Sequence, residues 1–254
     1  MSAFEVVAIL LAGLAAGTIN TVVGSGTLIT FPTLLAFGVP PVTANVSNNV
    51  GLVPGTLSGA IGYRRELRGQ RSRLVRLASA SVIGGTVGAV LLLRLPSAAF
   101  DAIVPVLIAL GVLLVVLGPK ISRRVAARAE ARGGLPEHGA AWVWPAVAGA
   151  GVYGGYFGAA QGVLLMAILG IGVEDDLQRH NATKNVLSLI VNGVAAVVFI
   201  AVADVDWAIA GLIAAGSVVG GQVGARVGRR LPPAVLRGVI VVVGLTALVF
   251  LVVG

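Results

Sequence analysis

Two short polar motifs lie within otherwise apolar parts of the chain, and each carries amides and hydroxyls at alternate positions. The motif residues are Asn45, Ser47, Asn48 and Asn49 in the first half and Asn181, Thr183, Lys184 and Asn185 in the second. Polar groups are costly inside hydrocarbon unless they have partners or line a cavity. Because positions i, i+2 and i+4 do not share one face of a helix, the spacing favours a helix start or an unwound turn.

Helix starts at these motifs would suit a negatively charged ligand. A helix N-terminus offers free N–H groups and a partial positive charge, and both attract anions. Two such starts that face each other would form one site, with the amides and hydroxyls as binding groups. The alternative is that the motifs only cap helices and form hydrogen bonds between them.

Lys184 is the one lysine near a predicted span, since the other, Lys120, lies in a polar central stretch. Its ammonium group could balance the charge of an anionic ligand. It could instead extend to the lipid headgroups, because the apolar run begins only three residues earlier. The neighbouring His180 has the chemistry of a proton relay, and an interfacial position without that role is the alternative.

Glycine-rich segments interrupt the apolar sequence at two further places, Gly24-Ser25-Gly26 and Gly158-Ala159-Ala160-Gln161-Gly162. Backbone that is not helical at membrane depth is tolerated only where it is buried or lines a cavity. Two breaks in corresponding places therefore point to a binding site, with Ser25, Thr27 and Gln161 as candidate binding residues. The alternative is a tight turn between two short helices.

Composition places the whole chain in a lipid environment. The 254 residues are 57% hydrophobic and 11% charged, with a mean hydropathy of +1.00, whereas a soluble domain carries about 25% charged residues. A net charge of +8 would indicate nucleic-acid binding in a soluble protein. Here the positive residues cluster between apolar runs, which indicates membrane topology and no nucleic acid. With no cysteine, two histidines and adjacent carboxylates only in the predicted solvated cluster 174–176, we expect no metal site.

The apolar runs predict about eight transmembrane helices, because a span needs about 20 mostly apolar residues. The long runs cover residues 4–23, 46–62, 74–94, 98–118, 142–158, 181–203, 207–228 and 234–253. Two shorter runs, 26–38 and 160–173, follow the glycine breaks and predict short or re-entrant segments.

Three motifs recur at one offset of 136 residues, which indicates an internal duplication. Ser81-Val82-Ile83-Gly84-Gly85 corresponds to Ser217-Val218-Val219-Gly220-Gly221, Arg94-Leu95-Pro96 to Arg230-Leu231-Pro232, and Asn45-x-Ser47-x-Asn49 to Asn181-x-Thr183-x-Asn185. We therefore divide the chain into a first transmembrane repeat (1–118), a basic cytoplasmic linker (119–141) and a second transmembrane repeat (142–254).

Charge predicts how the repeats are oriented. Residues 64–73 and 120–132 are rich in Arg and Lys, which is typical of cytoplasmic loops, whereas the segment 203–206 is acidic. An odd number of crossings must then separate the basic central stretch from the acidic segment. Each repeat then crosses the membrane an odd number of times. The second repeat is therefore inserted upside down relative to the first, as in many secondary transporters.

The order of these motifs resembles the TauE/SafE family, also called the sulfite exporter family. The matching segments are Gly24-Ser25-Gly26-Thr27, Gly38-Val39-Pro40-Pro41, Ala44 to Asn49, Ser58-Gly59-Ala60, Tyr63-Arg64-Arg65, Gly84-Gly85-x-x-Gly88-Ala89 and Arg94-Leu95-Pro96, with Asp206-Trp207, Gly220-Gly221-x-x-Gly224-Ala225 and Arg229-Arg230-Leu231-Pro232-Pro233 in the second half. The resemblance implies an integral plasma-membrane transporter of bacteria, with small sulfur-containing or organic anions as substrates.

We therefore expect an all-α polytopic membrane protein of two inverted-topology repeats, with a site between them. The expected function is secondary transport of a small anion, such as sulfite, an organosulfonate or a related organic anion, by alternating access. No ATP-binding motif, cofactor or catalytic residue is predicted, and the expected partners are the solute, the bilayer of the bacterial inner membrane and, as an open question, a second copy of the chain. Two alternatives are a non-transporting membrane scaffold and an intramembrane hydrolase with Ser25 as nucleophile, which would need His180 as its base.

Overall fold

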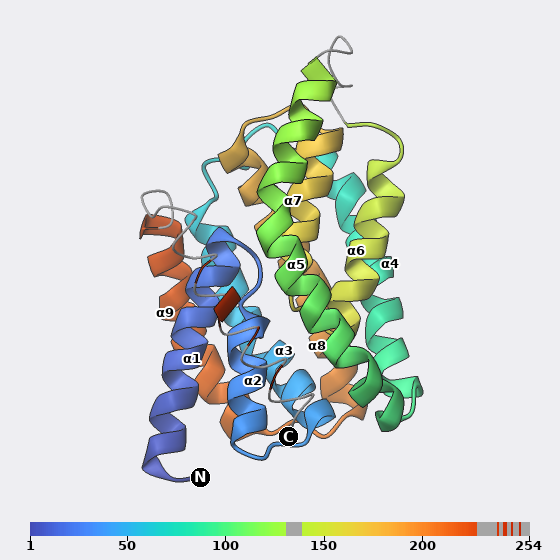
Figure 1. Ribbon diagram of the computed structural model, residues 1–254. Helices are drawn as coiled ribbons and strands as arrows, with labels where there is room; N and C mark the ends of the chain where they lie inside the picture. Colours follow the sequence, from blue (N-terminus) through green and yellow to red (C-terminus); the bar gives the residue numbers. More distant parts are fainter. Residues whose placement is uncertain (131–138, 228–237, 239–240, 243–244, 246–248, 250–254) are drawn as a thin grey trace.

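The computed structural model describes residues 1–130 and 139–227, together with residues 238, 241, 242, 245 and 249. The described residues form a bundle of α-helices (Figure 1). The helices are α1 (Ala3–Val22), α2 (Thr27–Ala36), α3 (Pro41–Gly62), α4 (Arg71–Arg94), α5 (Ser97–Glu130), α6 (Val143–Tyr156), α7 (Gln161–Gly172), α8 (Leu177–Val202) and α9 (Trp207–Val227).

Both predicted glycine breaks are confirmed as interruptions between helices. α1 ends at Val22 and α2 begins at Thr27, and α6 ends at Tyr156 and α7 begins at Gln161. At each break a glycine has a positive φ, +90° for Gly24 and +74° for Gly158, which costs an L-residue energy but not glycine. α2 and α7 have 10 and 12 residues, so each covers only about half of a bilayer core of about 30 Å.

The two polar motifs are not helix starts, so that prediction is wrong. α3 begins at Pro41, a residue suited to the first helical position because it needs no N–H partner there. α8 begins after Asp176, whose side chain accepts a hydrogen bond from the backbone N–H of Arg179 and caps the helix. Both motifs therefore lie in continuous helix, and their residues point in several directions.

Within the part of the chain that the structure describes, four helices, α1, α4, α8 and α9, are long and apolar enough to cross a membrane. Large apolar side chains on the outside, such as Phe4, Val75, Val106 and Val197, are 64–74% exposed and suit contact with lipid. The chain is therefore a multi-pass membrane protein. The last predicted span, 234–253, lies almost wholly outside the described residues. α5 continues without interruption through the predicted linker as far as Glu130.

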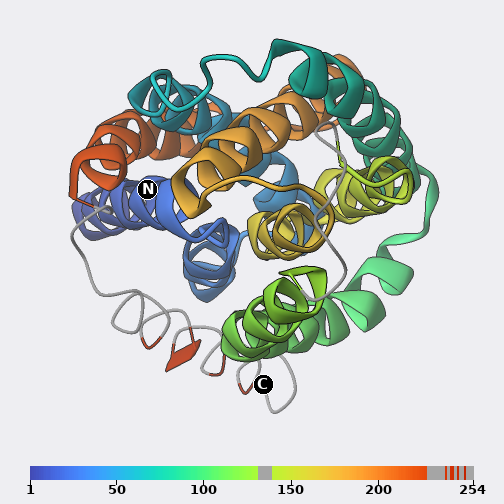
Figure 2. The ribbon, with the colours of Figure 1, turned by 90° about the horizontal axis from the view of Figure 1, so that it is seen from above.

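The helices pack in a reciprocal pattern that follows the offset of 136 residues. At this offset α1 to α4 correspond to α6 to α9 in order. α1 packs against α9 while α6 packs against α4, and α3 packs against α9 while α8 packs against α4. Viewed from above, α1 and α9 lie on one side of the bundle and α4 and α6 on the other (Figure 2).

α3 and its counterpart α8 contact each other and run antiparallel. The hydroxyl of Ser47, near the start of α3, accepts a hydrogen bond from the backbone N–H of Asp206, which follows α8. The amide of Gln70, which follows α3, accepts one from Thr183 near the start of α8. The loop 63–70 consequently lies at one end of the bundle, and the loop 203–206 lies at the other, with the N-terminus (Figure 1).

Candidate functional site

The two helix breaks meet inside the bundle, although 136 residues separate their equivalent positions. The backbone N–H of Gly162 donates to the carbonyl oxygen of Gly24 at 3.0 Å. A Cβ atom at either glycine would run into the backbone of the other, so glycine is required for this approach. The N-termini of the two half-length helices α2 and α7 are thereby brought to one place, where their partial positive charges add.

A small polar cavity lies beside this junction. The lining side chains are mainly amides and hydroxyls, and among the described residues none that lines the cavity is charged. The lining residues are Asn20, Gly24, Thr27, Asn48, Asn49, Leu52, Thr56, Phe157, Gly158, Gln161, Gly162, Ser188 and Asn192. The centre of a water molecule can occupy about 20 Å³ of it, which is room for one or two waters.

Two helical stripes form the walls of this cavity. Asn48, Leu52 and Thr56 follow one another at intervals of four residues on α3, and Ser188 and Asn192 do so on α8. Leu52 corresponds to Ser188, and Thr56 to Asn192, at the offset of 136. The amide of Asn192 donates to the hydroxyl of Thr56 at 3.5 Å, so equivalent residues of the two halves meet across the cavity.

Asn48 fixes the half-length helix α2 against α3. Its amide oxygen accepts a hydrogen bond of 2.5 Å from the hydroxyl of Thr30, and its amide nitrogen donates to the hydroxyl of Thr27 at 3.3 Å. Because all three side chains are buried, these bonds hold the first turn of α2 at the cavity wall.

Gln161 carries a free donor at the start of α7. The residue is 3% exposed, and its Nε2 atom has no hydrogen-bond partner. The Oδ1 atom of Asn49 is also buried and unpartnered. A buried polar atom without a partner is costly, so these two atoms on the cavity wall suit a bound molecule. Ser25 likewise has an unpartnered hydroxyl, but it does not line the cavity.

The second polar motif holds the broken end of α1. The ammonium nitrogen of Lys184 donates to the carbonyl oxygens of Asn20 at 2.9 Å and Thr21 at 3.1 Å. The amides of Asn181 and Asn185 also donate to Thr21, each at 3.2 Å. The break deprives these carbonyls of helical partners, and α8 supplies the replacements. Lys184 is 0% exposed and does not extend to the surface.

The first motif holds the broken end of α6 in the corresponding way. The amide of Asn45 donates at 3.0 Å to the carbonyl oxygen of Tyr156, the last residue of α6. Ser47 and Thr183 bond outside the cavity, at opposite ends of the bundle.

The structure therefore separates the predicted binding residues into two groups. Thr27, Asn48, Asn49 and Gln161 line the cavity. The others do not line it, and they are Ser25, Asn45, Ser47, Asn181, Thr183, Lys184 and Asn185. Sequence reasoning missed Thr56, Ser188 and Asn192, whose signal was a spacing of four residues along α3 and α8.

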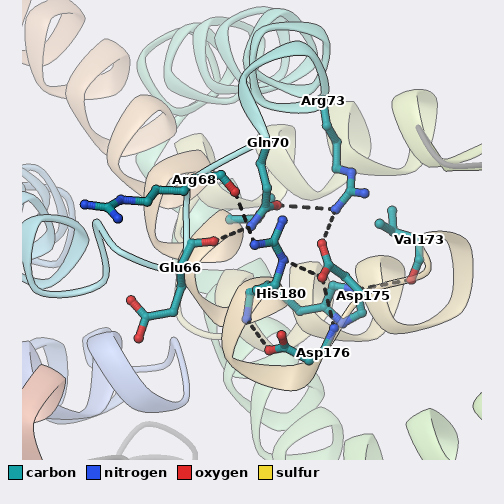
Figure 3. A network of polar contacts seen from close by, with 10 residues as sticks. Glu66, Arg68, Gln70, Arg73, Val173, Asp175, Asp176 and His180 are labelled. Carbon is teal, nitrogen blue, oxygen red and sulfur yellow. Dashed lines mark hydrogen bonds and ion pairs between the residues drawn. The ribbon is translucent and has the colours of Figure 1, made fainter.

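A polar network joins the two halves at the end of the bundle that carries the basic loop (Figure 3). Asp175 forms ion pairs with Arg73 of α4 at 2.6 Å and with Arg179 of α8 at 2.5 Å. Arg179 also donates to the backbone carbonyl of Arg68, and Arg73 donates to Gln70. The prediction of a solvated acidic cluster is thus wrong for Asp175, whose side chain is 12% exposed.

The charge of Asp175 is stabilised by these partners. Burial raises the pKa of its carboxyl, but hydrogen bonds from Arg73, the backbone of Asp176 and Arg179 outweigh burial, and the pKa is lowered below its ordinary value. Nearby, the ring nitrogen Nε2 of His180 lies 3.1 Å from the carbonyl oxygen of Val173. Ser25 has no hydrogen-bond partner, so Ser25 and His180 do not form a nucleophile–base pair.

Comparison with known proteins identifies the family of this chain. Residues 9–251 match the family model described as "Sulfite exporter TauE/SafE". "Probable membrane transporter protein YfcA" of Escherichia coli (strain K12) is 26% identical over 231 residues, which cover 90% of this chain and 82% of that protein. "Probable membrane transporter protein ORF9" of Sinorhizobium sp is 26% identical over 252 residues, covering 96% and 91%. No solved structure matches significantly. The resemblance seen in the sequence is confirmed, and the chain belongs to the TauE/SafE family.

Proposed function

We propose that this protein is a secondary transporter of a small anion, such as sulfite or an organosulfonate, in the inner membrane of bacteria. One observation carries the proposal. The N-termini of two half-length helices, one from each half of the chain, converge on a cavity where the buried amide of Gln161 has a free N–H donor. The names of the relatives, probable membrane transporter proteins, support the same function.

The arrangement of the helices supports two inverted repeats. The equivalent helices α3 and α8 run antiparallel, the equivalent breaks meet, and the packing of the outer helices is reciprocal. Inverted repeats are related by a pseudo-two-fold axis in the membrane plane. A site on that axis has similar surroundings toward either side of the membrane. Rocking one repeat against the other would then open the cavity to either side in turn, which is alternating access.

The chemistry of the cavity favours an anion over a cation. Helix N-termini present partial positive charge, and no described carboxylate lines the cavity to hold a cation. Amide N–H and hydroxyl groups can replace part of the hydration shell of an oxyanion. The cavity is small in this state, so binding requires the walls to move apart.

The network around Asp175 holds the two halves together at the end of the bundle that carries the basic loop, and so closes that end. It connects the two halves through the ion pair between Arg73 and Asp175 and through the hydrogen bond that Arg179 donates to the carbonyl of Arg68. Such bonds between the halves must break when that end opens. The scaffold alternative is less well supported, because a scaffold has no need of a polar cavity beside Asn49.

The test is uptake by proteoliposomes that contain the purified protein, with labelled sulfite, methanesulfonate and acetate as substrates. We expect saturable uptake of at least one of these anions. Replacing Gln161 by Leu should reduce uptake by about tenfold, as expected for one lost hydrogen bond to a charged ligand. A matched control is Gln222→Leu, since Gln222 donates to Ser58 away from the cavity. No saturable flux of any anion would overturn the proposal.

A further inference from the structure

The corresponding stripes of α3 and α8 line the cavity at every position but one. On α3 the residues Asn48, Leu52 and Thr56 all line the cavity. On α8 the equivalents of the last two, Ser188 and Asn192, also line it. The equivalent of Asn48 is Lys184, which lies one turn from Ser188 on the same face of α8. Lys184 is therefore the one residue of the two stripes that does not line the cavity in this structure, although it lies one turn from the lining residue Ser188.

In this structure the ammonium group of Lys184 is bound to the end of α1. It donates to the carbonyls of Asn20 and Thr21, and Asn20 itself lines the cavity. Among the described residues no carboxylate pairs with Lys184. A fully buried cation without a counter-ion is costly, and capping alone does not require it, since Asn45 holds the end of α6 with a neutral amide.

We infer that Lys184 is the single charged ligand of the transport site and that the site accepts monovalent anions and rejects divalent ones. This inference rests on the proposed function. One buried positive charge neutralises one negative charge, and the side chains that line the cavity are neutral. The two helix N-termini add only partial positive charge, which stabilises an anion by less than the burial of a second negative charge costs. A dianion would keep one uncompensated charge in the low-dielectric interior, which is strongly unfavourable.

Binding would also change the contacts of α1. When the ammonium group of Lys184 moves toward an anion, the carbonyl of Asn20 loses its donor, whereas Thr21 keeps Asn181 and Asn185. The broken end of α1 is then free to shift, which links the presence of substrate to movement of the first half.

The experiment compares methanesulfonate, with one negative charge, and sulfate, with two, by calorimetric titration of the purified protein in nanodiscs at neutral pH. We expect wild type to bind methanesulfonate at least about a hundredfold more tightly than sulfate. This comparison needs no variant and so does not depend on the folding of a mutant. Equal affinity for the two anions would overturn the inference while leaving the proposed function intact. Binding of neither anion would count against both.

Variants then assign the selectivity to Lys184. Lys184→Met should weaken methanesulfonate binding by at least about a hundredfold and Lys184→Arg by less, because Arg keeps the charge. Lys120→Met is the control, since this other lysine is exposed on α5 and should bind as wild type does.

A second pair of variants leaves Lys184 in place. Ser188→Asp adds a carboxylate one turn from Lys184 and should abolish methanesulfonate binding by neutralising the lysine. Ser188→Asn, of similar size and uncharged, should retain most of it. Unchanged binding by Lys184→Met or by Ser188→Asp would overturn the role of Lys184.

Discussion

The two helix breaks share a backbone arrangement but are held by different chemistry. Each contains a glycine with positive φ, and each leaves carbonyl groups at the end of a helix without helical partners. At the first break these carbonyls accept hydrogen bonds from Lys184 and two asparagines of α8. At the second break, Asn45 is the one described side chain that donates to the carbonyl of Tyr156.

Aromatic packing takes the place of polar contacts at the second break. The ring of Phe157 meets the rings of Phe31 and Phe100 edge-on, with centroids 5.1 Å and 6.1 Å apart. The residue equivalent to Phe157 at the first break is Thr21. We therefore expect the contacts of the first break, which is held by a charged side chain and two amides, to change when a ligand binds, whereas aromatic packing holds the second break rigidly with Gln161 at the cavity wall.

The largest expected effect is at the aromatic wall. Phe157 is 3% exposed, and Phe157→Ala should lower the free energy of unfolding by about 3–5 kcal/mol, through lost apolar burial and the cavity left behind. Denaturant unfolding in mild detergent measures it. Phe4→Ala is the control, because Phe4 is 74% exposed, and should cost less than about 1 kcal/mol. A similar loss for both would show that the second break is not rigid.

The contact between the breaks should be the next most sensitive. In Gly162→Ala the new methyl group meets the backbone of Gly24, and we expect a loss of about 1–3 kcal/mol from overpacking. Gly170→Ala lies in the same helix, where a methyl group meets nothing within 4 Å. It should be neutral or slightly stabilising, since Ala favours helix over Gly. If the two variants melt alike, the breaks do not touch.

The polar contacts should show the asymmetry between the breaks directly. Among the described residues no other side chain donates to the carbonyl oxygen of Tyr156, so Asn45→Leu should cost about 2 kcal/mol by leaving a buried carbonyl unsatisfied. Asn181→Leu should cost less than about 1 kcal/mol, because Lys184 and Asn185 still donate to Thr21. Thermal unfolding of the two variants side by side measures the difference. Equal losses would remove this distinction between the breaks.

The network at the end of the bundle should give the smallest effect, below about 1 kcal/mol, because Arg179, one of the two partners of Asp175, is 31% exposed and an asparagine at position 175 can still accept a hydrogen bond. The lowered pKa of Asp175 means that its contribution is present above the ordinary pKa of an aspartate and is lost as pH falls through the lowered value. The difference in stability between wild type and Asp175→Asn should be constant from about pH 6 to 8 and vanish in more acidic buffer. A difference that grows on acidification would contradict the ion-pair account.

Sequence alone predicted the backbone better than the contacts. The glycine breaks and the offset of 136 were visible because they depend on local composition and on repetition. The helix starts were misplaced because amides at alternate positions resemble caps, although Pro41 and Asp176 carried stronger start signals. Asp175 was read as solvated because its partner Arg73 is 102 residues away, and sequence gives no measure of such proximity. Ser188 and Asn192 were missed as isolated polar residues in an apolar run.

The most direct test of transport through this cavity uses the absence of cysteine from the chain. The variant Ser188→Cys places a single cysteine at a position that lines the cavity. An anionic thiol reagent that does not cross membranes is then added to one side or the other of sealed vesicles. We predict labelling from both sides, slowed by methanesulfonate, whereas Ser81→Cys, at a 0% exposed position in α4, stays unlabelled. Labelling from one side only, at a rate that no anion changes, would contradict alternating access through this site.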